Sequence, residues 1–356
     1  MCHKSILTRI IVLGSLLQLT ACSTLGYLAH TSHGHMKLMS DRQPIARLLE
    51  DDSLDQTQAE QFKTILAVRE FAIRQLHLPD NESYTTYVNL KRDYVTWVVF
   101  AAPQLSLQAE SWCFWIVGCV PYRGYFDERK AKQFAEQLRK KSLDVYIAPV
   151  PAYSTLGWFS DPVLSSMLNR GEVATAEYIF HELAHQQLYI KNHTSFNEAF
   201  ATTVGRLGVE TWLQSENKTV QLKQYQQIQQ NKQEIYEIVE QLKLQLSDIY
   251  ESSLTDEKEK VHLKQSAFAE YKKMIVSKTK KWKHQQKYQQ WLMDNMNNAK
   301  LNSFSTYQSL VPAFISLFER CNRNFADFYV AVQSTQALSD MQRIEFLHKA
   351  KCHSEI

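Results

Sequence analysis

The second half of the chain lacks the residues that most often interrupt helices. No glycine follows Gly208, and Pro312 is the one proline beyond that point. Because glycine and proline are the strongest local breaks in regular structure, this composition predicts helix throughout the second half. Residues 214–287 are rich in Gln, Lys and Glu and have apolar residues at steps of three and four, which predicts a long helical hairpin that turns at 251–256. Such a pair either packs on itself or offers an arm to a partner.

The first half alternates between two periodicities. Residues 44–78 have apolar residues at helical spacing, with Asp55 placed to cap a helix. Residues 84–88 and 94–100 are rich in β-branched and aromatic side chains, which predicts two strands joined as a hairpin at 89–93. The same criteria predict a strand at 114–117, a helix at 127–140 and a strand at 144–150. We therefore expect an α+β chain that is predominantly helical, with a small sheet before residue 172.

A His-Glu-x-x-His motif occupies residues 181–185. On a helix, predicted here over 172–190, His181 and His185 project from one face and can bind the same zinc ion at roughly 2.0–2.1 Å. Glu182 lies one step round the helix, at the position of the general base in zinc peptidases. The alternative without a metal site is a buried amphipathic helix with two partly exposed histidines. Burying these three side chains costs several kcal/mol unless each has a partner, and a metal provides one.

A catalytic zinc usually has three protein ligands and an open position for water. Glu198 is the best third ligand, in the first turn of a helix predicted from 196 to 213, with Thr194 or Ser195 as its cap. His193, in the preceding turn, is the competing ligand. It would also be the fourth ligand of a purely structural zinc site.

Several segments together resemble a bacterial family of zinc aminopeptidases that are predicted lipoproteins. The matching segments are 118–126, 153–162, 181–185 with 197–201, and 297–299 with Tyr307 and 312–314. The resemblance implies that His181, His185 and Glu198 bind one Zn²⁺ and that Glu182 is the base. The aminopeptidase activity rests on this resemblance alone. No spacing in the sequence identifies the carboxylate that would bind a substrate's α-ammonium group. Asp161 and Glu177 are the candidates for that role.

The N-terminus has the features of a bacterial lipoprotein signal. Residues 1–21 combine Lys4 and Arg9 with a short apolar run, and they end in Leu-Thr-Ala before Cys22. We therefore expect Cys22 to be lipidated and to anchor the protein in the cell envelope, facing the periplasm. Ser23 favours the outer membrane. Residues 22–41 are then a tether, and 42–356 form the metallopeptidase domain.

Histidines are frequent in the predicted tether. His30, His33 and His35 lie close enough in sequence to bind a metal, but a flexible segment after a lipid anchor is the simpler interpretation.

Charge and cysteine content limit the remaining possibilities. Two units of the net charge of +3 belong to the signal segment, so the rest of the chain is nearly neutral, which argues against a nucleic-acid partner. The oxidising periplasm permits disulfides. Cys113 and Cys119 are close enough to close a short loop, and Cys321 and Cys352 could join the last helices. Four cysteines allow three pairings, and the sequence leaves all three open.

The loop predicted at 153–169 is expected to lead into the active site. Tyr153 is the first candidate to stabilise the oxyanion, and Tyr122 and Arg123 are the others.

Together these features predict a zincin-like peptidase that cleaves peptides with zinc. Two other functions stay open. One is an envelope endopeptidase or quality-control protease, which would cut blocked or internal peptides. The other is a non-catalytic envelope module with structural zinc.

Overall fold

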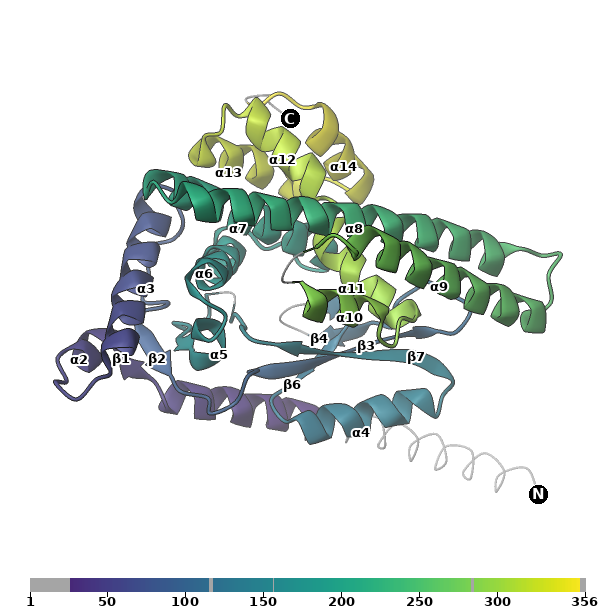
Figure 1. Ribbon diagram of the computed structural model, residues 1–356, viewed down its shortest axis with the longest axis horizontal. Coiled ribbons are helices and arrows are strands. Elements are labelled where there is room, and N and C mark those ends of the chain that lie inside the picture. Colours follow the sequence, from purple (N-terminus) through teal and green to yellow (C-terminus); the bar gives the residue numbers. More distant parts are fainter. Residues whose placement is uncertain (1–25, 115–117, 156, 283–284, 353–356) are drawn as a thin grey trace, which may run out of the picture.

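The computed structural model describes residues 26–114, 118–155, 157–282 and 285–352. The signal segment, Cys22 and residues 115–117 of one predicted strand lie outside the described residues. Within them the chain is mostly helical with small sheets, as the sequence predicts (Figure 1).

The largest sheet by strand length has β3 (Thr96–Pro103) at its centre, with antiparallel neighbours β6 (Arg123–Tyr125) and β7 (Leu143–Val150). A short antiparallel pair, β4 (Trp112–Phe114) and β5 (Gly118–Val120), is closed by the Cys113–Cys119 disulfide. The third sheet has the order β1-β2-β8, formed by β1 (Gln43–Pro44), β2 (Thr86–Val88) and β8 (Val163–Leu164).

The predicted hairpin of residues 84–100 is wrong. β2 pairs antiparallel with β1 on one edge and parallel with β8 on the other, so neither edge is left for β3. The connecting Leu90 donates its backbone N–H to Ser165 Oγ at 3.0 Å instead of to a neighbouring strand. Strand propensity was therefore correct in both segments, but their pairing was decided by segments far away in the sequence.

Two helices pack beside the β3 sheet on the side of Arg123. α4 (Glu128–Arg139) begins at its cap Asp127 and packs on β3 and β7. Residues 26–40, predicted as part of a flexible tether, instead form a helix, the purple one in Figure 1. Its Tyr27 ring lies against Tyr125 of β6, with 5.3 Å between ring centroids. Aromatic contacts and burial of Leu38 and Met39 explain why this stretch is ordered.

The centre of the molecule is a group of helices with one large apolar core. α3 (Gln56–Arg74), capped by Asp55 as predicted, packs on α6 (Glu172–Gln187), and α6 packs on α7 (Thr194–Ser215). Two short helices, α2 (Ile45–Leu49) and α5 (Ser165–Leu168), complete the group. The loop predicted at 153–169 thus contains β8 and α5.

The second half is helical as predicted. α8 (Thr219–Glu251) and α9 (Glu257–Thr279) form the hairpin, and its turn is where the sequence places it. The remaining helices are α10 (Gln286–Met293), α11 (Asn298–Gln308), α12 (Val311–Arg320), α13 (Phe325–Gln333), the 3-10 turn η1 (Ser334–Ala337) and α14 (Asp340–Lys349). The hairpin has its own apolar core with α10 and α11, including Leu242 and Tyr271. The interpretation as a pair packed within the molecule therefore holds for these residues.

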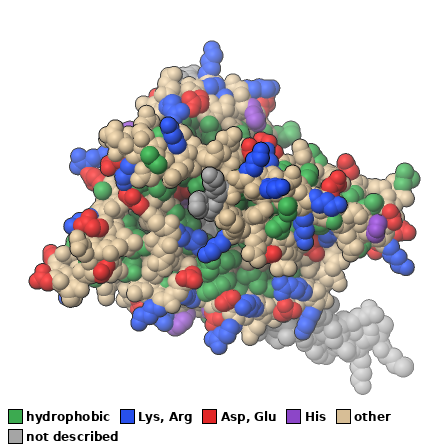
Figure 2. Space-filling model, in the orientation of Figure 1, with side chains coloured by type: hydrophobic (Ala, Val, Ile, Leu, Met, Phe, Trp, Pro, Cys, Tyr) green, Lys and Arg blue, Asp and Glu red, His purple; other side chains and the backbone are tan. Residues whose placement is uncertain are grey.

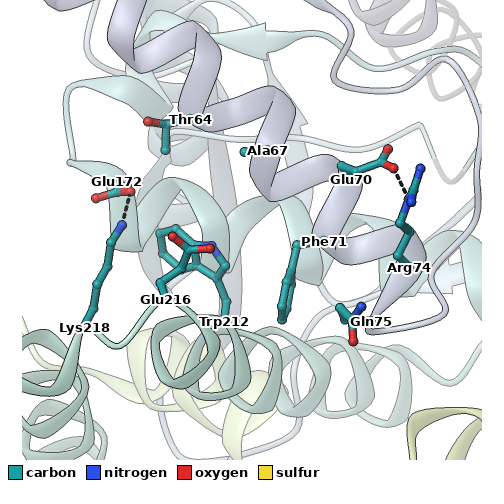
Figure 3. Close-up of a pocket in the computed structure, with 10 residues that line it drawn as sticks. All are labelled: Thr64, Ala67, Glu70, Phe71, Arg74, Gln75, Glu172, Trp212, Glu216 and Lys218. Atoms are coloured by element: carbon teal, nitrogen blue, oxygen red, sulfur yellow. Dashed lines mark hydrogen bonds and ion pairs between the residues drawn. The ribbon is translucent and has the colours of Figure 1, made fainter.

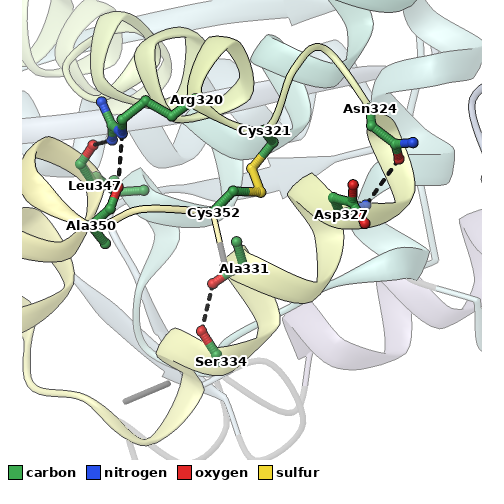
Figure 4. Close-up of a disulfide and its surroundings, with 9 residues drawn as sticks. All are labelled: Arg320, Cys321, Asn324, Asp327, Ala331, Ser334, Leu347, Ala350 and Cys352. Atoms are coloured by element: carbon green, nitrogen blue, oxygen red, sulfur yellow. Dashed lines mark hydrogen bonds between the residues drawn. A yellow bond between two sulfur atoms is a disulfide. The ribbon is translucent and has the colours of Figure 1, made fainter. Parts of the chain in front are cut away.

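A disulfide fixes the C-terminal helices. Cys321, at the end of α12, is bonded to Cys352, which follows α14 (Figure 4). Arg320 donates from Nε to the carbonyl of Ala350 at 2.8 Å and so strengthens the same junction. With Cys113–Cys119, this selects one of the three pairings that the sequence left open.

The surface mixes charges of both signs over the face seen in Figure 2, in keeping with the small net charge of +3. Among the described residues, no helix is both long enough and apolar enough to cross a bilayer.

Candidate metal centre

The candidate metal centre depends on an unusually close approach of α6 and α7. Gly205 of α7 faces α6 where a Cβ would stand 3.2 Å from the Glu177 carbonyl oxygen and 3.4 Å from His181 Cβ. At Gly208 an added Cβ would lie 2.7 Å from atoms of Leu76 and Phe180. Larger residues here would push the helices apart, so these two glycines let α7 reach the face that carries the histidines.

The turn between these helices is held by one buried side chain. Asn197, 1% exposed, accepts the backbone N–H of Ile190 at 2.9 Å and donates to the Ile190 carbonyl at 2.7 Å. These two hydrogen bonds hold the turn between Ile190 and Asn197 and fix the start of α7. Neither Thr194 nor Ser195 provides the predicted side-chain cap, because α7 begins at Thr194, two residues earlier than predicted, and His193 stands at its N-cap position. Glu198 follows Asn197 directly and is therefore set at a fixed height opposite α6.

Three donor atoms from the two helices converge. His181 Nε2 and His185 Nε2 are 3.2 Å apart. Glu198 Oε2 lies 3.4 Å from the first nitrogen and 3.5 Å from the second. The side chains of His181, His185 and Glu198 keep 15%, 6% and 11% of their surface exposed, so the group is sheltered but reachable.

This triangle matches the requirement of a small tetrahedral cation. Ligands about 2.0–2.2 Å from one zinc ion, at tetrahedral angles, lie about 3.3–3.5 Å from each other. The three observed separations fall close to this range. Two imidazoles and a carboxylate are also a ligand set that zinc accepts, and the Nε2 atoms otherwise face each other with only Glu198 between them.

Glu182 is the fourth member of the cluster. Its carboxylate and the ligand atoms of His181 and His185 all lie within 4.8 Å of one another, a group that could itself hold a metal. Glu198 Oε2, in contrast, is nearly equidistant from both imidazole nitrogens, as a shared third ligand would be. Glu182 follows His181 directly on α6 and points about 100° away around the helix, beside the metal position.

The two glutamates have opposite electrostatic environments. Burial raises the pKa of Glu182 to about 7, and the charges of Glu198 and Asp161 add to this against the lowering effect of His181. Burial also acts to raise the pKa of Glu198, but the imidazoles of His185 and His181 outweigh it and bring the value down to about 2. A carboxylate that stays ionised suits a ligand, and one that changes protonation near neutral pH suits a proton carrier.

Two buried tyrosines from other elements are close enough to the cluster for its carboxylates to influence their pKa values. Tyr122 precedes β6, and Tyr307 lies on α11. Burial and the Glu198 carboxylate raise the pKa of both hydroxyls well above the usual value, so both stay protonated and can donate hydrogen bonds. Tyr122 was a predicted contact. Tyr307 was quoted only as part of the family resemblance, since no local pattern brings residue 307 next to residue 198.

The other two predicted contacts lie elsewhere. Tyr153 bonds through its hydroxyl to His35 Nδ1 at 2.5 Å, toward the helix of residues 26–40. Arg123 lies in β6, where adjacent residues point to opposite faces. Its guanidinium lies 3.9 Å from the centroid of the Tyr27 ring. Neither side chain is in contact with the histidine pair.

The alternative histidine ligands are also separate from the centre. His193 Nδ1 is 2.7 Å from Asp340 Oδ1 at the start of α14, which explains its position in the turn. Of the three histidines in the first helix, His30 contacts Lys130 and His35 contacts Tyr153. Among the described residues, the 181–185 group is the one cluster of this kind that could hold a metal.

The sequence reasoning missed the polar group behind Glu182. Ser154 donates its hydroxyl to Asp161 Oδ2 at 3.3 Å and also acts to lower the pKa of Glu182, and Tyr84 lies buried near both Glu182 and Asp161. The sequence predicts the loop of residues 153–169 near the active site and names Tyr153, the neighbour of Ser154, as its first candidate donor. Tyr84 carried no signal, because it sits just ahead of a strand far away in the sequence.

Residues 26–347 match the family described as “putative aminopeptidase”. The chain belongs to this family. No curated protein and no solved structure matched the chain. Membership supports a peptidase function and agrees with the resemblance seen in the sequence. The matched range contains both helices of the metal centre.

A separate pocket of about 340 Å³ lies between α3, the start of α6 and the end of α7 (Figure 3). Four of its five charged groups form pairs, with Lys218 2.6 Å from Glu172 and Arg74 beside Glu70, and Glu216 is the fifth. None of the members of the metal cluster lines it. This pocket is therefore separate from the candidate metal centre.

Asp161 generates a prediction about stability and pH. Burial raises its pKa from 3.8 to about 6, while hydrogen bonds from Thr155 and Ser154 and the charge of Arg42 oppose the rise. Between pH 3.8 and about pH 6, Asp161 is protonated in the folded chain but ionised in the unfolded chain. The contribution of Asp161 to the free energy of unfolding is therefore highest below the lower pKa and is lost as the pH rises through the upper pKa. We expect wild type to lose about 3 kcal/mol more than Asp161→Asn over this range.

Urea unfolding of both proteins at about pH 4 and about pH 8 measures this difference. The matched substitution Asp51→Asn, at an exposed carboxylate, gives the background for removing an aspartate charge. Parallel pH dependences in wild type and Asp161→Asn would contradict the assignment.

Proposed function

We propose that this protein is a zinc-dependent peptidase, specifically an aminopeptidase anchored in the bacterial cell envelope through Cys22. The observation that carries the zinc proposal is the triangle of His181 Nε2, His185 Nε2 and Glu198 Oε2, with sides of 3.2, 3.4 and 3.5 Å. The family match supports peptide hydrolysis as the reaction.

His181, His185 and Glu198 would hold the zinc ion. When bound, zinc supplies a Lewis acid that polarises the scissile carbonyl and makes a nearby water more acidic. Glu182 accepts the proton from the attacking water and returns it to the leaving amine. A carboxyl group with a pKa of about 7 suits both halves of this cycle, since it can be charged before attack and neutral after it.

The tyrosines supply the remaining transition-state contact. A negative oxygen develops on the substrate carbonyl as water attacks, and hydrogen-bond donors already in place stabilise it. Tyr122 and Tyr307 both carry protonated hydroxyls near Glu182 and Glu198. We assign them this role in place of Tyr153 and Arg123, whose contacts lie elsewhere.

An aminopeptidase also needs a negative group for the substrate's free α-ammonium. Of the two candidates, Asp161 is fully buried. Glu177 is partly exposed and lies one helical turn before His181, on the same face of α6. Glu177 forms no ion pair within 4 Å among the residues that the structure describes, and its carboxylate influences the pKa values of Tyr225 and Arg206. We therefore choose Glu177 as the ammonium anchor.

The alternative of a non-catalytic structural zinc has less support. Such a site needs a fourth protein ligand. His193 was the candidate, and its imidazole is paired with Asp340.

The first prediction of the proposal concerns Glu182→Gln. We expect wild type and variant, both without the lipid anchor, to bind one zinc per chain, because Glu182 is not a ligand. The kcat of the variant should fall by about 10²–10⁴-fold, since the amide cannot accept the proton. Metal analysis and cleavage of a pool of free and N-acetylated peptides measure both properties.

Three outcomes of that experiment would change the proposal. Internal cleavage of the acetylated peptides would favour the endopeptidase. Zinc binding without any cleavage by wild type would favour the non-catalytic module. Absence of zinc from both proteins would contradict the metal centre itself.

A second prediction concerns Glu177→Gln. Loss of a charge-assisted hydrogen bond should raise KM for peptides with a free N-terminus by about 10–100-fold. Glu172→Gln, on the same helix but paired with Lys218, is the matched control and should leave KM unchanged. Equal kinetics for the two variants would remove Glu177 from the role of anchor.

A third prediction concerns the envelope anchor. Wild type expressed in a bacterium should incorporate labelled fatty acid and sediment with membranes, because a lipidated Cys22 carries several acyl chains. Cys22→Ser should do neither. Labelling of the serine variant would mean that the lipid is attached elsewhere.

A further inference from the structure

The segment of residues 157–159 presents two adjacent aromatic side chains to solvent. Trp158 is 69% exposed and Phe159 is 49% exposed. Among the Trp, Tyr and Phe side chains whose burial the structure describes, these two alone are exposed. Single exposed apolar residues are common on protein surfaces, whereas a contiguous group of them marks a surface that binds something.

Hydrogen bonds hold these two residues in a fixed turn. Thr155 Oγ1 donates to the Phe159 carbonyl at 3.0 Å and accepts the Phe159 N–H at 3.1 Å, and the Trp158 N–H donates to the Thr155 carbonyl at 3.1 Å. Gly157 has a φ of +81°, which glycine adopts without strain. The Thr155 N–H is itself bound to the buried Asp161 carboxylate at 2.9 Å. The fold therefore holds both aromatic side chains at the surface.

The helix of residues 26–40 lies beside this turn. The centroid of its His35 ring is 4.5 Å from that of the Phe159 ring. Arg42, two residues after the helix, donates from Nη1 to the Ser160 carbonyl at 3.0 Å. The helix and the turn are therefore in contact at two places and form one continuous surface.

Two exposed apolar residues of the helix extend this surface. Leu28 is 43% exposed and Met36 is 61% exposed. They lie about 12 Å apart along the helix axis and about 80° apart around it, both on the side that faces solvent. In Figure 1 this purple helix runs along the outer side of the molecule, beside α4. We call the side chains of Leu28, Met36, Trp158 and Phe159 the apolar patch.

The proposed lipid anchor indicates what meets the apolar patch. Four residue steps separate Cys22 from Gly26, where the helix begins. An extended chain spans at most about 3.3–3.6 Å per residue, so the helix begins within about 14 Å of the lipid attachment point. The patch is therefore kept close to a bilayer. Tryptophan is also the side chain that favours the boundary between water and hydrocarbon.

We propose that the apolar patch docks on the surface of the membrane that holds the acyl chains of Cys22. Its four side chains then lie at the boundary between headgroups and acyl chains. This inference rests on the proposed lipid anchor and goes beyond it, because an anchor alone leaves the protein free to rotate, whereas a docked patch fixes which side of the protein faces the membrane.

The test measures how closely Trp158 approaches the lipid. Mature lipidated protein is purified from bacterial membranes and reconstituted in vesicles of phosphatidylcholine and phosphatidylglycerol, with and without brominated phosphatidylcholine, which quenches tryptophan fluorescence on contact. The variants are Trp158→Ser and the double variant Leu28→Ser with Met36→Ser. Met341→Ser is the matched control, because Met341 is also an exposed methionine, 83% exposed, on α14 at the opposite side of the molecule in Figure 1.

We expect brominated lipid to quench wild type. The quenching should fall by at least about threefold in Trp158→Ser, since the other tryptophans that the structure describes are buried or half-buried. The Leu28→Ser, Met36→Ser double variant keeps Trp158 and should lose about half of the quenching, because its insertion is shallower. Met341→Ser should match wild type. All of these proteins should incorporate the same amount of labelled fatty acid.

Other results overturn the inference. Equal quenching of wild type and Trp158→Ser, in proteins that carry the lipid, would reject the docking surface and leave the anchor intact. An equal loss in Met341→Ser would show that the effect does not belong to the patch. Shielding of Trp158 by an apolar peptide, without any response to brominated vesicles, would make the patch a substrate surface instead.

Failure of the proposed anchor gives a different result. Wild type would then incorporate no fatty acid, and the unlipidated protein is mixed with the same vesicles. Quenching that is lost in Trp158→Ser would retain the patch as a membrane surface without the anchor, and no quenching would reject it. Peptidase activity enters none of these measurements, so its absence leaves the result unchanged.

Discussion

The close packing of α6 against α7 is the contact on which the metal centre depends. The two histidines come from one helix and Glu198 from the other, so the distance between helix axes decides whether three donor atoms can meet. Gly205 and Gly208 remove the side chains that would keep the helices apart, and Asn197 fixes the turn that joins them. The triangle with sides of 3.2, 3.4 and 3.5 Å is the consequence of this backbone geometry.

The same geometry separates the chemistry of two glutamates. Glu198 faces two imidazoles, and their attraction exceeds the cost of burial. Glu182 is equally enclosed, but its neighbours include two further carboxylates, and its pKa rises toward neutrality. Two carboxyl groups of one residue type therefore have pKa values on opposite sides of the usual value, because a charge in a poorly hydrated site is governed by the few groups around it.

The rest of the fold serves to enclose this centre. The β3 sheet presents Tyr122 from one direction, and α11 presents Tyr307 from another. α11 also shares an apolar core with the α8–α9 hairpin, so the hairpin packs on the helix that carries Tyr307. The loop with Ser154 and Asp161 closes the side of Glu182 and is itself tied to the end of α6 through Ser83.

Much of the architecture could be predicted because its signals are local. The absence of glycine after Gly208 and the single proline in that half predicted its helices. The spacing of His181 and His185 predicted that both imidazoles lie on one helix face. Pairing was not predictable in this way: β2 joins β1 and β8 instead of β3, since strand partners depend on which edges remain free. The same limit applied to the helix of residues 26–40, which depends on contacts with distant rings such as Tyr125.

For the candidate site, the sequence by itself predicted the group of His181, Glu182, His185 and Glu198, because residue type and helical spacing suggest their proximity, and the structure brings these side chains together. Only the tertiary structure decided which other side chains reach them. Glu198 and Glu182 influence the pKa of Tyr122, whereas the neighbouring Arg123 packs on Tyr27. Tyr307, Ser154 and Asp161 reach the glutamates from segments whose distance from α6 in space is fixed by packing, a property that no local pattern encodes.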